Sequence, residues 1–389
     1  MPFFDYDRAT RLMAARGIDV LLVHTLTNTV YLSGHQCPWV SPTVMLEDGC
    51  TFYATFVGVA RDPGIPPFLV TTLAEEGHIL YGDCWIKDVR YWGIPFVIEG
   101  REEQTGFIAD PIEAVAAALE ERGLASACIG VELEHIPADT LQRLQRRLPM
   151  ATFANSWPVL WSLRAIKHPE EIRRMRLAAR ASEKAVQAAF DTAREGMSEL
   201  EMEDVLARVV AEHGCRYEWS SVAFGTKGAI MVGPTEARLK RGDIVRIDLV
   251  ASYRGWLSDM SRNAVFGEPS ARMIDAHDAV WKTNTLVQQA IRPGVSCDEL
   301  YRLGFEYMHR RGYRMLTEQV GHGVGRNSNE PLFLTHGVQE RLEPNMVVTV
   351  EIPLRLADVG SINIEDLLLV TEDGNEPLTT MTGELQRLG

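Results

Sequence analysis

The chain opens with apolar residues at helical spacing, followed by a short apolar run. Residues 6–16 carry apolar side chains three and four positions apart and are followed by Gly17, which predicts an amphipathic helix that ends there. The run at 18–23 is typical of a buried strand. Segments of both kinds recur, with a helix predicted at 111–123 and a strand at 128–133. This alternation favours a mixed sheet covered by helices.

A second domain is predicted to begin where the pattern changes, near residue 160. Pro169 and the two glutamates after it mark the start of a long helix, and apolar residues recur along one face of that helix. We therefore expect two domains, comprising residues 1–160 and 161–389.

The composition is that of an ordinary globular protein with a surplus of acid. The 389 residues include 39 Lys and Arg against 53 Asp and Glu, which gives a formal net charge of −14. This surplus disfavours nucleic acid or an anionic membrane as the main partner, because both select basic patches. The six cysteines are too sparse for a disulfide framework, and neither a signal peptide nor a spanning apolar run stands out. We expect a cytoplasmic protein.

Carboxylates interrupt apolar strand patterns at several places in the second half. In the run GDIVRIDLV, apolar residues alternate around Asp248, and Asp259 follows after the turn signal YRG. A hairpin of that length could bring the two carboxylates side by side. Near the C-terminus, Glu351 interrupts one further apolar run, and Glu365 and Asp366 interrupt another. Burying an unpaired carboxylate is costly, so a compensating positive charge is expected.

Two kinds of positive charge could stabilise these acids. Arginines such as Arg246 or Arg262 could form ion pairs with some of them. A divalent cation is favoured, because several carboxylates can share one ion. A histidine flanked by glycines in the run VGHGVG adds a nitrogen ligand, since the glycines let the backbone turn tightly and leave the imidazole accessible. The metal-site hypothesis rests on five residues in this order along the chain: Asp248, Asp259, His322, Glu351 and Glu365.

These motifs resemble those of the creatinase/prolidase family of pita-bread metallohydrolases, which includes aminopeptidase P, prolidase and methionine aminopeptidase. The resemblance runs through LRAIKHPEEIRRMRLAA, GDIVRIDLV, WLSDMSR, GHGVG, LEPNMVVTVE and INIEDLLLVTEDG. The first part of the chain, including HTLTNTVYLSGHQ, resembles the smaller creatinase-type amino-terminal domain. The resemblance implies an α/β (α+β) fold, with a creatinase-like domain at 1–160 and a pita-bread catalytic domain at 161–389.

The same resemblance implies a metal centre and a chemistry. In the family, two Asp, one His and two Glu bind a pair of divalent ions, which here implies Asp248, Asp259, His322, Glu351 and Glu365 as ligands. This oxygen-rich set suits Mn²⁺, Zn²⁺, Fe²⁺ or Co²⁺. A hydroxide bridging the two ions is then expected to cleave an amide or other C–N bond of a small substrate. Glu351 has a second implied role, as the carrier of a proton to the leaving group.

The chain departs from the peptidases of the family at two positions. Those peptidases have a histidine shortly before the first metal-binding strand. In this chain the corresponding position is Met231 or Val232, and no histidine lies between His213 and His277. A second histidine, in the pattern HExP, is replaced by Asn329, which can donate a hydrogen bond to an oxyanion but cannot carry charge. We therefore expect an intact metal centre with altered groups for handling a peptide, and count Asn329 with Glu351 as catalytic candidates.

Several functions remain open at this point. The favoured one is hydrolysis of a small, non-standard amide or C–N bond, and the nearest alternative is an Xaa-Pro dipeptidase or aminopeptidase. A metal-dependent lyase on the same scaffold would form an alkene and add no water. A metal-free binding or scaffold protein is disfavoured, because none of the five ligands is lost.

Substrate selectivity is expected to lie in aromatic and basic residues around the metal centre. Candidates for an apolar or cation–π wall are Trp39, Tyr217, Trp219, Phe224 and Trp256. Arg326, Arg355 or His24 could bind a substrate carboxylate. His24 and Trp39 would act from the amino-terminal domain, which in dimeric relatives reaches the neighbouring subunit's site. We therefore expect a homodimer.

Overall fold

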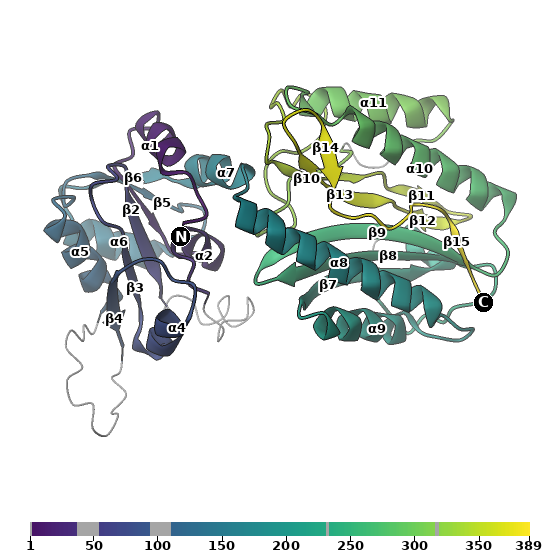
Figure 1. Ribbon diagram of the computed structural model, residues 1–389, viewed down its shortest axis with the longest axis horizontal. Helices are drawn as coiled ribbons and strands as arrows, with labels where there is room; N and C mark the ends of the chain where they lie inside the picture. The colour runs from purple at the N-terminus through teal and green to yellow at the C-terminus, as the bar shows by residue number, and fades with distance from the viewer. Residues whose placement is uncertain (1, 37–53, 94–109, 231–232, 316–318) are drawn as a thin grey trace, which may run out of the picture. The chain divides into compact units, whose positions relative to one another are not determined.

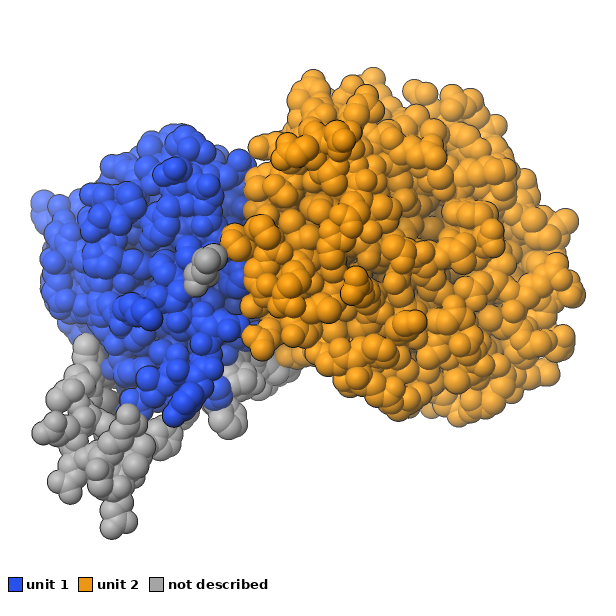
Figure 2. Space-filling model, viewed as in Figure 1, with its two compact units in different colours: residues 1–164 blue, residues 165–389 orange. Residues whose placement is uncertain are grey.

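The computed structural model describes residues 2–36, 54–93, 110–230, 233–315 and 319–389, and the chain divides into two compact units (Figure 1). Unit 1 comprises residues 1–164 and unit 2 residues 165–389, coloured separately in Figure 2. Within the described residues, no helix combines the length and the apolar character that crossing a lipid bilayer requires.

Unit 1 is a mixed six-stranded sheet accompanied by helices, which confirms the fold class predicted from the alternating pattern (Figure 1). Its strands lie in the order β4-β3-β2-β1-β5-β6, and β1 runs antiparallel to β2 and parallel to β5. The elements are α1 (Tyr6–Ala14), β1 (Val20–Val23), α2 (Leu26–Ser33), β2 (Phe56–Ala60), β3 (Phe68–Thr72), the 3₁₀ helix η2 (Leu73–Glu75), α4 (Glu76–Tyr81), β4 (Asp88–Trp92), α5 (Pro111–Glu121), β5 (Cys128–Val131), α6 (Ala138–Arg147), β6 (Thr152–Asn155) and α7 (Trp157–Ala165).

Local sequence signals set the ends of these helices. Helix α1 starts after Asp5, whose carboxylate accepts a hydrogen bond from the backbone N–H of Arg8 at 2.7 Å, and Gly17 follows the helix with a φ of 65°. Helix α5 begins at Pro111, with Asp110 capping its first turn. The predicted helices therefore form where a capping side chain precedes an apolar stripe.

Unit 2 contains a seven-stranded sheet whose main path is β10-β13-β9-β8-β7, with β14 beside β13 and β15 beside β9. Its elements are α8 (Pro169–Asp191), α9 (Glu199–Glu212), β7 (Arg216–Phe224), the 3₁₀ helix η3 (Gly225–Ala229), β8 (Ile244–Tyr253), β9 (Trp256–Phe266), α10 (Ala271–Ala290), α11 (Cys297–Arg310), β10 (Val347–Glu351), β13 (Glu365–Val370), β14 (Asn375–Pro377) and β15 (Gln386–Leu388). Strands β11 (Leu354–Leu356) and β12 (Gly360–Ile362) form a separate hairpin.

Two pairs of helices cover the strands of unit 2 (Figure 1). Helices α8 and α9 pack against β7, β8 and β9 over a core that includes Val186, Leu206 and Ile247. Helices α10 and α11 share a second core with β10 and β13, which includes Val280 and Val348. Burial on this scale holds the strands rigidly, and the candidate site lies on four of them.

Candidate metal centre

A tight hairpin positions the two aspartates. Strands β8 and β9 are joined by Arg254 and Gly255, which have φ values of 52° and 80°, as in a two-residue type I′ turn. The resulting register offsets Asp248 and Asp259 by two residues, so the aspartates are diagonal neighbours on one face of the sheet. Both side chains are buried. The sequence pattern predicted this proximity.

The two glutamates face each other across neighbouring strands. Glu351, at the end of β10, is the cross-strand partner of Glu365, at the start of β13. Like charges placed directly opposite destabilise a sheet, so the pair requires a cation or a proton. Glu365 also lies opposite Ser261 of β9. Because β13 lies between β10 and β9, it brings the glutamates to the strand that carries Asp259.

The backbone around His322 directs the imidazole toward the glutamates. Nδ1 lies 3.1 Å from the carbonyl oxygen of Gly323, which can only accept, so a hydrogen bond there is donated by Nδ1 and leaves Nε2 directed at the glutamates. Nε2 is 3.7 Å from Oε1 of Glu351 and 3.9 Å from Oε1 of Glu365. A Cβ on Gly321 would lie 2.1 Å from a carbonyl oxygen of β10, so this loop requires glycine beside the histidine.

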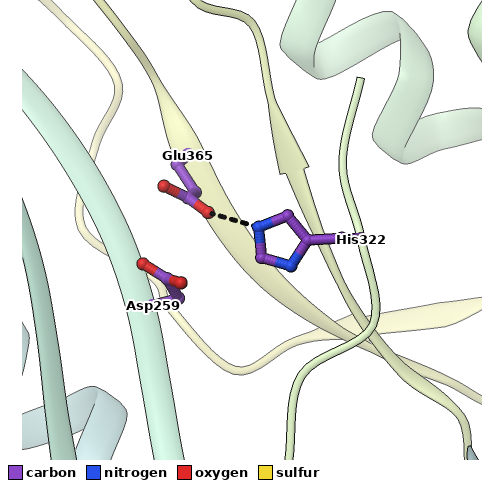
Figure 3. A group of neighbouring side chains, drawn as sticks. All are labelled: Asp259, His322 and Glu365. Atoms are coloured by element: carbon purple, nitrogen blue, oxygen red, sulfur yellow. Dashed lines mark ion pairs between the residues drawn. The ribbon is translucent and has the colours of Figure 1, made fainter. Parts of the chain in front are cut away.

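Three of the five side chains converge closely enough to share an ion. Asp259, His322 and Glu365 each offer one atom, these atoms lie within 4.8 Å of one another, and the side chains meet in Figure 3. Oε1 of Glu365 is buried and accepts no hydrogen bond from any residue that the structure describes. Asp248 and Glu351 line the same cavity. Four carboxylates, one of them with a buried oxygen that accepts no hydrogen bond, and one imidazole fit a divalent metal ion.

The protein environment disfavours ionisation of Asp248, Asp259 and Glu365. Burial raises the pKa of Asp248 to about 7, an effect that Arg246 opposes and Glu351 reinforces. Burial also raises the pKa of Asp259 and of Glu365 well above the usual values, and neighbouring carboxylates add to both shifts. Such a cluster is typical of functional sites, where a bound cation stabilises the ionised form.

Adjacent acids on β13 have different partners, because successive residues of a strand face opposite sides. Asp366 forms an ion pair with Arg262 at 2.5 Å and accepts a hydrogen bond from Gln288 at 2.8 Å. Glu365 instead joins the acid cluster. The hypothesis that arginines neutralise the strand carboxylates therefore describes Asp366 and not Glu365.

A cavity of about 490 Å³ opens over the acid cluster. All five predicted ligands line this cavity, and the lining also includes Trp219, Arg246, Gln319, Asn329, Arg355 and Asn363. The lining of the cavity therefore combines the acid cluster with two arginines.

Arg246 is a buried cation within this cavity. It lies two residues before Asp248 on β8 and therefore faces the same side of the sheet. Its guanidinium donates hydrogen bonds to the hydroxyl oxygen of Ser221 and, at 3.3 Å, to that of Ser361. Burial lowers the pKa of Arg246, which Asp248 opposes and Arg355 reinforces.

A buried ion pair anchors the loop that carries Asn329. Nζ of Lys167 lies 3.3 Å from Oε2 of Glu330, and both side chains are almost fully buried. Glu330 also accepts hydrogen bonds from the backbone N–H groups of Arg326 and Asn327, at 2.9 and 3.3 Å. Asn329 is exposed and lines the cavity. The anchor therefore places an amide donor at the rim.

The structure brings Trp219 to the cavity but not Phe224. Trp219 lines the cavity and is 42% exposed, whereas Phe224 is buried in the core that β7 shares with α8 and α9. Positions 219 and 224 differ in parity along β7, so their side chains face opposite sides of the strand. The alternation of side chains along the strand could have predicted from the sequence that only one of the two residues faces the cavity.

The structure does not place the remaining substrate-binding candidates in this cavity. Arg326 places its guanidinium 4.6 Å from the ring centre of Trp256, which is fully buried and so cannot form a cavity wall. His24 belongs to unit 1, where its Nδ1 lies 3.1 Å from a carboxylate oxygen of Glu132. Trp39 lies outside the described residues.

Sequence reasoning did not single out two polar residues of the lining. Gln319 donates a hydrogen bond from Nε2 to Oε1 of Glu351 at 3.0 Å and thereby orients that carboxylate. Asn363 is buried, and its Oδ1 has no hydrogen-bond partner among the described residues. Gln319 lies three residues before His322, and Asn363 lies two residues before Glu365. This closeness to predicted metal ligands is the feature of the sequence that could have identified both residues.

Comparisons with known proteins identify matches over both units. The model of metallopeptidase family M24 matches residues 173–372, and that of the creatinase/prolidase N-terminal domain matches residues 6–166. An uncharacterized peptidase of Staphylococcus aureus is 30% identical over 254 residues, which are 64% of this chain and 72% of that protein. The Xaa-Pro dipeptidase of Bacillus anthracis superposes with a TM-score of 0.83 at 23% identity, covering 98% of this chain and 99% of that one. The prolidase of Pyrococcus horikoshii OT3 gives 0.81 at 23% identity, with coverage of 98% and 99%.

Proposed function

Because this chain belongs to metallopeptidase family M24, we propose that it is a hydrolase that holds two divalent ions and cleaves the amide bond of a small substrate. The observation that carries the proposal is the convergence of Asp259, His322 and Glu365 within 4.8 Å, with Asp248 and Glu351 lining the same cavity. The cavity volume of about 490 Å³ suits a molecule the size of a dipeptide.

The five ligands would supply enough negative charge for two divalent ions, because four of them are carboxylates. Ions bound there would lower the pKa of water and polarise a substrate carbonyl. The set suits Mn²⁺, Zn²⁺, Fe²⁺ or Co²⁺. The raised pKa values of Asp248, Asp259 and Glu365 mean that ion binding displaces protons from these side chains.

Two further groups have roles that follow from their positions. The side chain of Glu351 is 16% exposed, more than those of His322 and Glu365, and Gln319 orients its carboxylate. We assign Glu351 the transfer of a proton to the leaving nitrogen, in addition to ion binding. Asn329 at the rim would donate a hydrogen bond to the carbonyl oxygen as negative charge develops there.

A second candidate is cleavage of Xaa-Pro dipeptides. The observation that favours it is the extent of the similarity to proteins described as a prolidase and an Xaa-Pro dipeptidase, which covers 98% of this chain. At position 329 this chain has a neutral asparagine, whereas the peptidases that it resembles have a histidine. This difference argues for a small amide other than an Xaa-Pro dipeptide. A homodimer remains our expectation for the assembly.

Metal analysis and a substrate panel test both candidates. Protein purified without chelator should carry about two divalent ions per chain, as the donor set implies. Turnover with Mn²⁺ or Zn²⁺ should then be compared for Ala-Pro, Gly-Pro, cyclic amides, creatine-like ureas and betaine esters. Brisk turnover of Xaa-Pro dipeptides would select the second candidate.

Two variants accompany the panel. Glu351→Gln should abolish turnover, whereas Glu268→Gln, which changes a carboxylate with 79% exposure, should not. Unchanged turnover by the Glu351 variant would remove its role in proton transfer. Products with an alkene and no added water would identify a lyase, and absence of bound metal would leave a binding protein.

A further inference from the structure

Two arginines lie against the ring of Trp256, the first residue of β9. The indole is fully buried, and the guanidinium carbons of Arg326 and Arg174 lie 4.6 and 4.5 Å from its ring centre. A guanidinium group at this distance is attracted by the face of an indole, more strongly where water is excluded. Arg174 belongs to α8, whereas Arg326 belongs to the loop that carries Asn329. The indole therefore connects this loop to a long helix.

The same loop, residues 325–330, contacts the β8–β9 hairpin directly and is called the rim loop below. The carbonyl oxygen of Gly325 accepts a hydrogen bond from the backbone N–H of Leu257 at 2.8 Å. Arg326 passes so close to the hairpin turn that a Cβ on Gly255 would lie 2.8 Å from one of its guanidinium nitrogens. The rim loop is thus docked on the hairpin that carries both aspartates of the acid cluster.

Glu171 of α8 accepts the N–H of the indole. Its Oε1 lies 2.9 Å from Nε1 of Trp256, and its Oε2 accepts the backbone N–H of His168 at 2.8 Å. This carboxylate is buried. A negative charge at the indole N–H raises the electron density of the ring and so strengthens the attraction of the ring for a cation. Glu171 therefore strengthens the contact between Trp256 and Arg326.

We propose that Trp256 and Glu171 are positioning residues, which hold the rim loop on the β8–β9 hairpin and thereby set where the amide of Asn329 lies relative to the metal centre. The inference rests on the proposed function for the role of Asn329. Arg326 docks the loop at one end, and the buried ion pair of Glu330 holds the other end. A donor to a developing negative charge needs a fixed position, because a displaced donor stabilises the transition state less.

Protonation of Glu171 gives this arrangement a pH dependence. Burial raises the pKa of Glu171 to about 7; hydrogen bonds from the indole and a backbone N–H oppose the shift, as does the charge of Lys167, and Glu330 reinforces it. Arg174 and Arg326 are the charged groups at the ring itself. Above pH 7 the ionised carboxylate strengthens the ring contact, and below pH 7 the neutral acid does not. The rim loop should therefore be held more firmly at pH 8 than at pH 6.

Hydrogen–deuterium exchange of the full chain with saturating Mn²⁺ measures how firmly the rim loop is held. The backbone N–H groups of Arg326 and Asn327 donate to Glu330, so their protection factors, corrected for the intrinsic effect of pH, report the docking. At pH 8, Arg326→Met and Trp256→Leu should each lower this protection about tenfold, and Arg326→Lys should keep part of it by retaining the charge. Arg326→Met serves as the test should Trp256→Leu fail to fold.

Glu171→Gln separates positioning from packing, because glutamine has nearly the same shape and does not titrate. Protection in the unmodified protein should fall about threefold between pH 8 and pH 6, whereas in Glu171→Gln it should not change. Loss of ions at the lower pH would affect both proteins alike. The matched control is Arg272→Met, which removes an exposed arginine 5.1 Å from the ring centre of Tyr313 and should leave the rim loop unchanged.

Kinetics on the most rapidly hydrolysed member of the substrate panel test the consequence for Asn329. Arg326→Met should lower kcat about tenfold, raise KM by no more than a few fold and leave the metal content unchanged. In an Asn329→Ala background the same substitution should have no further effect on kcat, since both act through one hydrogen bond. Additive effects of the two substitutions would refute the action through Asn329.

Unchanged protection in Arg326→Met, or the same pH dependence in Glu171→Gln as in the unmodified protein, would overturn the inference. The proposed function fails separately. Loss of protection in the variants without hydrolysis of any amide by the unmodified protein would refute the hydrolase and leave the docking intact. Amide hydrolysis with full protection in Arg326→Met would refute the docking alone.

Discussion

Replacing Asp248 with asparagine is expected to stabilise the metal-free protein at pH 8, although Asp248 is a proposed metal ligand. Burial raises the pKa of Asp248 to about 7 from an ordinary value of 3.8. The folded state therefore binds this proton more tightly than the unfolded state does. The resulting penalty on the folded state is absent below pH 3.8, grows as the pH rises, and is complete above about pH 7.

The size of the effect follows from the two pKa values. Each unit of pKa difference corresponds to about 1.36 kcal/mol, so a carboxylate that titrates near 7 when folded and near 3.8 when unfolded costs about 4 kcal/mol at pH 8. At pH 5 the same linkage gives a penalty of less than half that size, roughly 2 kcal/mol. Asparagine carries no charge at either pH, so Asp248→Asn should recover these amounts.

Denaturant titration of chelator-treated protein at pH 8 and pH 5 measures the prediction. Adding Mn²⁺ should reverse the order of stability, because an ion at a thousandfold excess over its Kd stabilises the unmodified protein by about 4 kcal/mol and the variant by less. The matched control is Asp366→Asn, which leaves the buried Arg262 without its carboxylate partner and should destabilise the protein by about 3 kcal/mol with or without metal. The reasoning is refuted if Asp248→Asn destabilises the metal-free protein at pH 8, or stabilises it equally at both pH values.

Further predictions concern the histidine, its loop and the pH. His322→Ala should lower the metal content and reduce kcat/KM by about 100-fold or more, as measured by elemental analysis and kinetics; full metal content would contradict its role as a ligand. Gly321→Ala should destabilise the protein by about 2 to 4 kcal/mol, because the new Cβ would lie 2.1 Å from the carbonyl oxygen of Thr349; an unchanged unfolding midpoint would refute this. Lys167→Met should cost about 3 kcal/mol by removing the ammonium group from the buried Glu330, and should also raise KM by loosening the rim loop. Metal affinity measured by calorimetry should fall as the pH drops below 7, because protons compete for the acids, and a flat profile would show that no proton is displaced.

The local elements of the fold were predictable from short-range patterns, and the strand order was not. Pro169 and the glutamates after it predicted the start of α8, where the side chain of His168 and that of Glu171 form a capping box. The alternation around Asp248 predicted β8 and its hairpin. Period-two patterning shows which side of a strand is buried, but it does not show which strand lies beside it. Hence it gave no indication that β13 separates β10 from β9.

For the candidate site too, the residues could be selected from local patterns, but their long-range partners could not. Asp248, Asp259, His322, Glu351 and Glu365 were selected because acids in apolar runs and a histidine between glycines are unusual in sequence, and the structure brings all five to one cavity. Their assignment as ligands remains a proposal. Arg246 was considered as a partner for those acids, whereas its guanidinium binds Ser221 and Ser361 instead. That outcome depends on a hairpin far along the chain, which no local pattern could place.

The placement of β13 also sets the order in which the acid cluster can assemble during synthesis. Asp248 and Asp259 emerge from the ribosome together and are aligned by their own tight turn. Glu351 and Glu365 follow much later, and Glu365 reaches the aspartates only when the strand that carries it inserts beside β9. With the proposed ligand set, a nascent chain would therefore have only the two aspartates, which alone would bind a metal ion weakly. Tight retention of metal would then report that the last strands have docked.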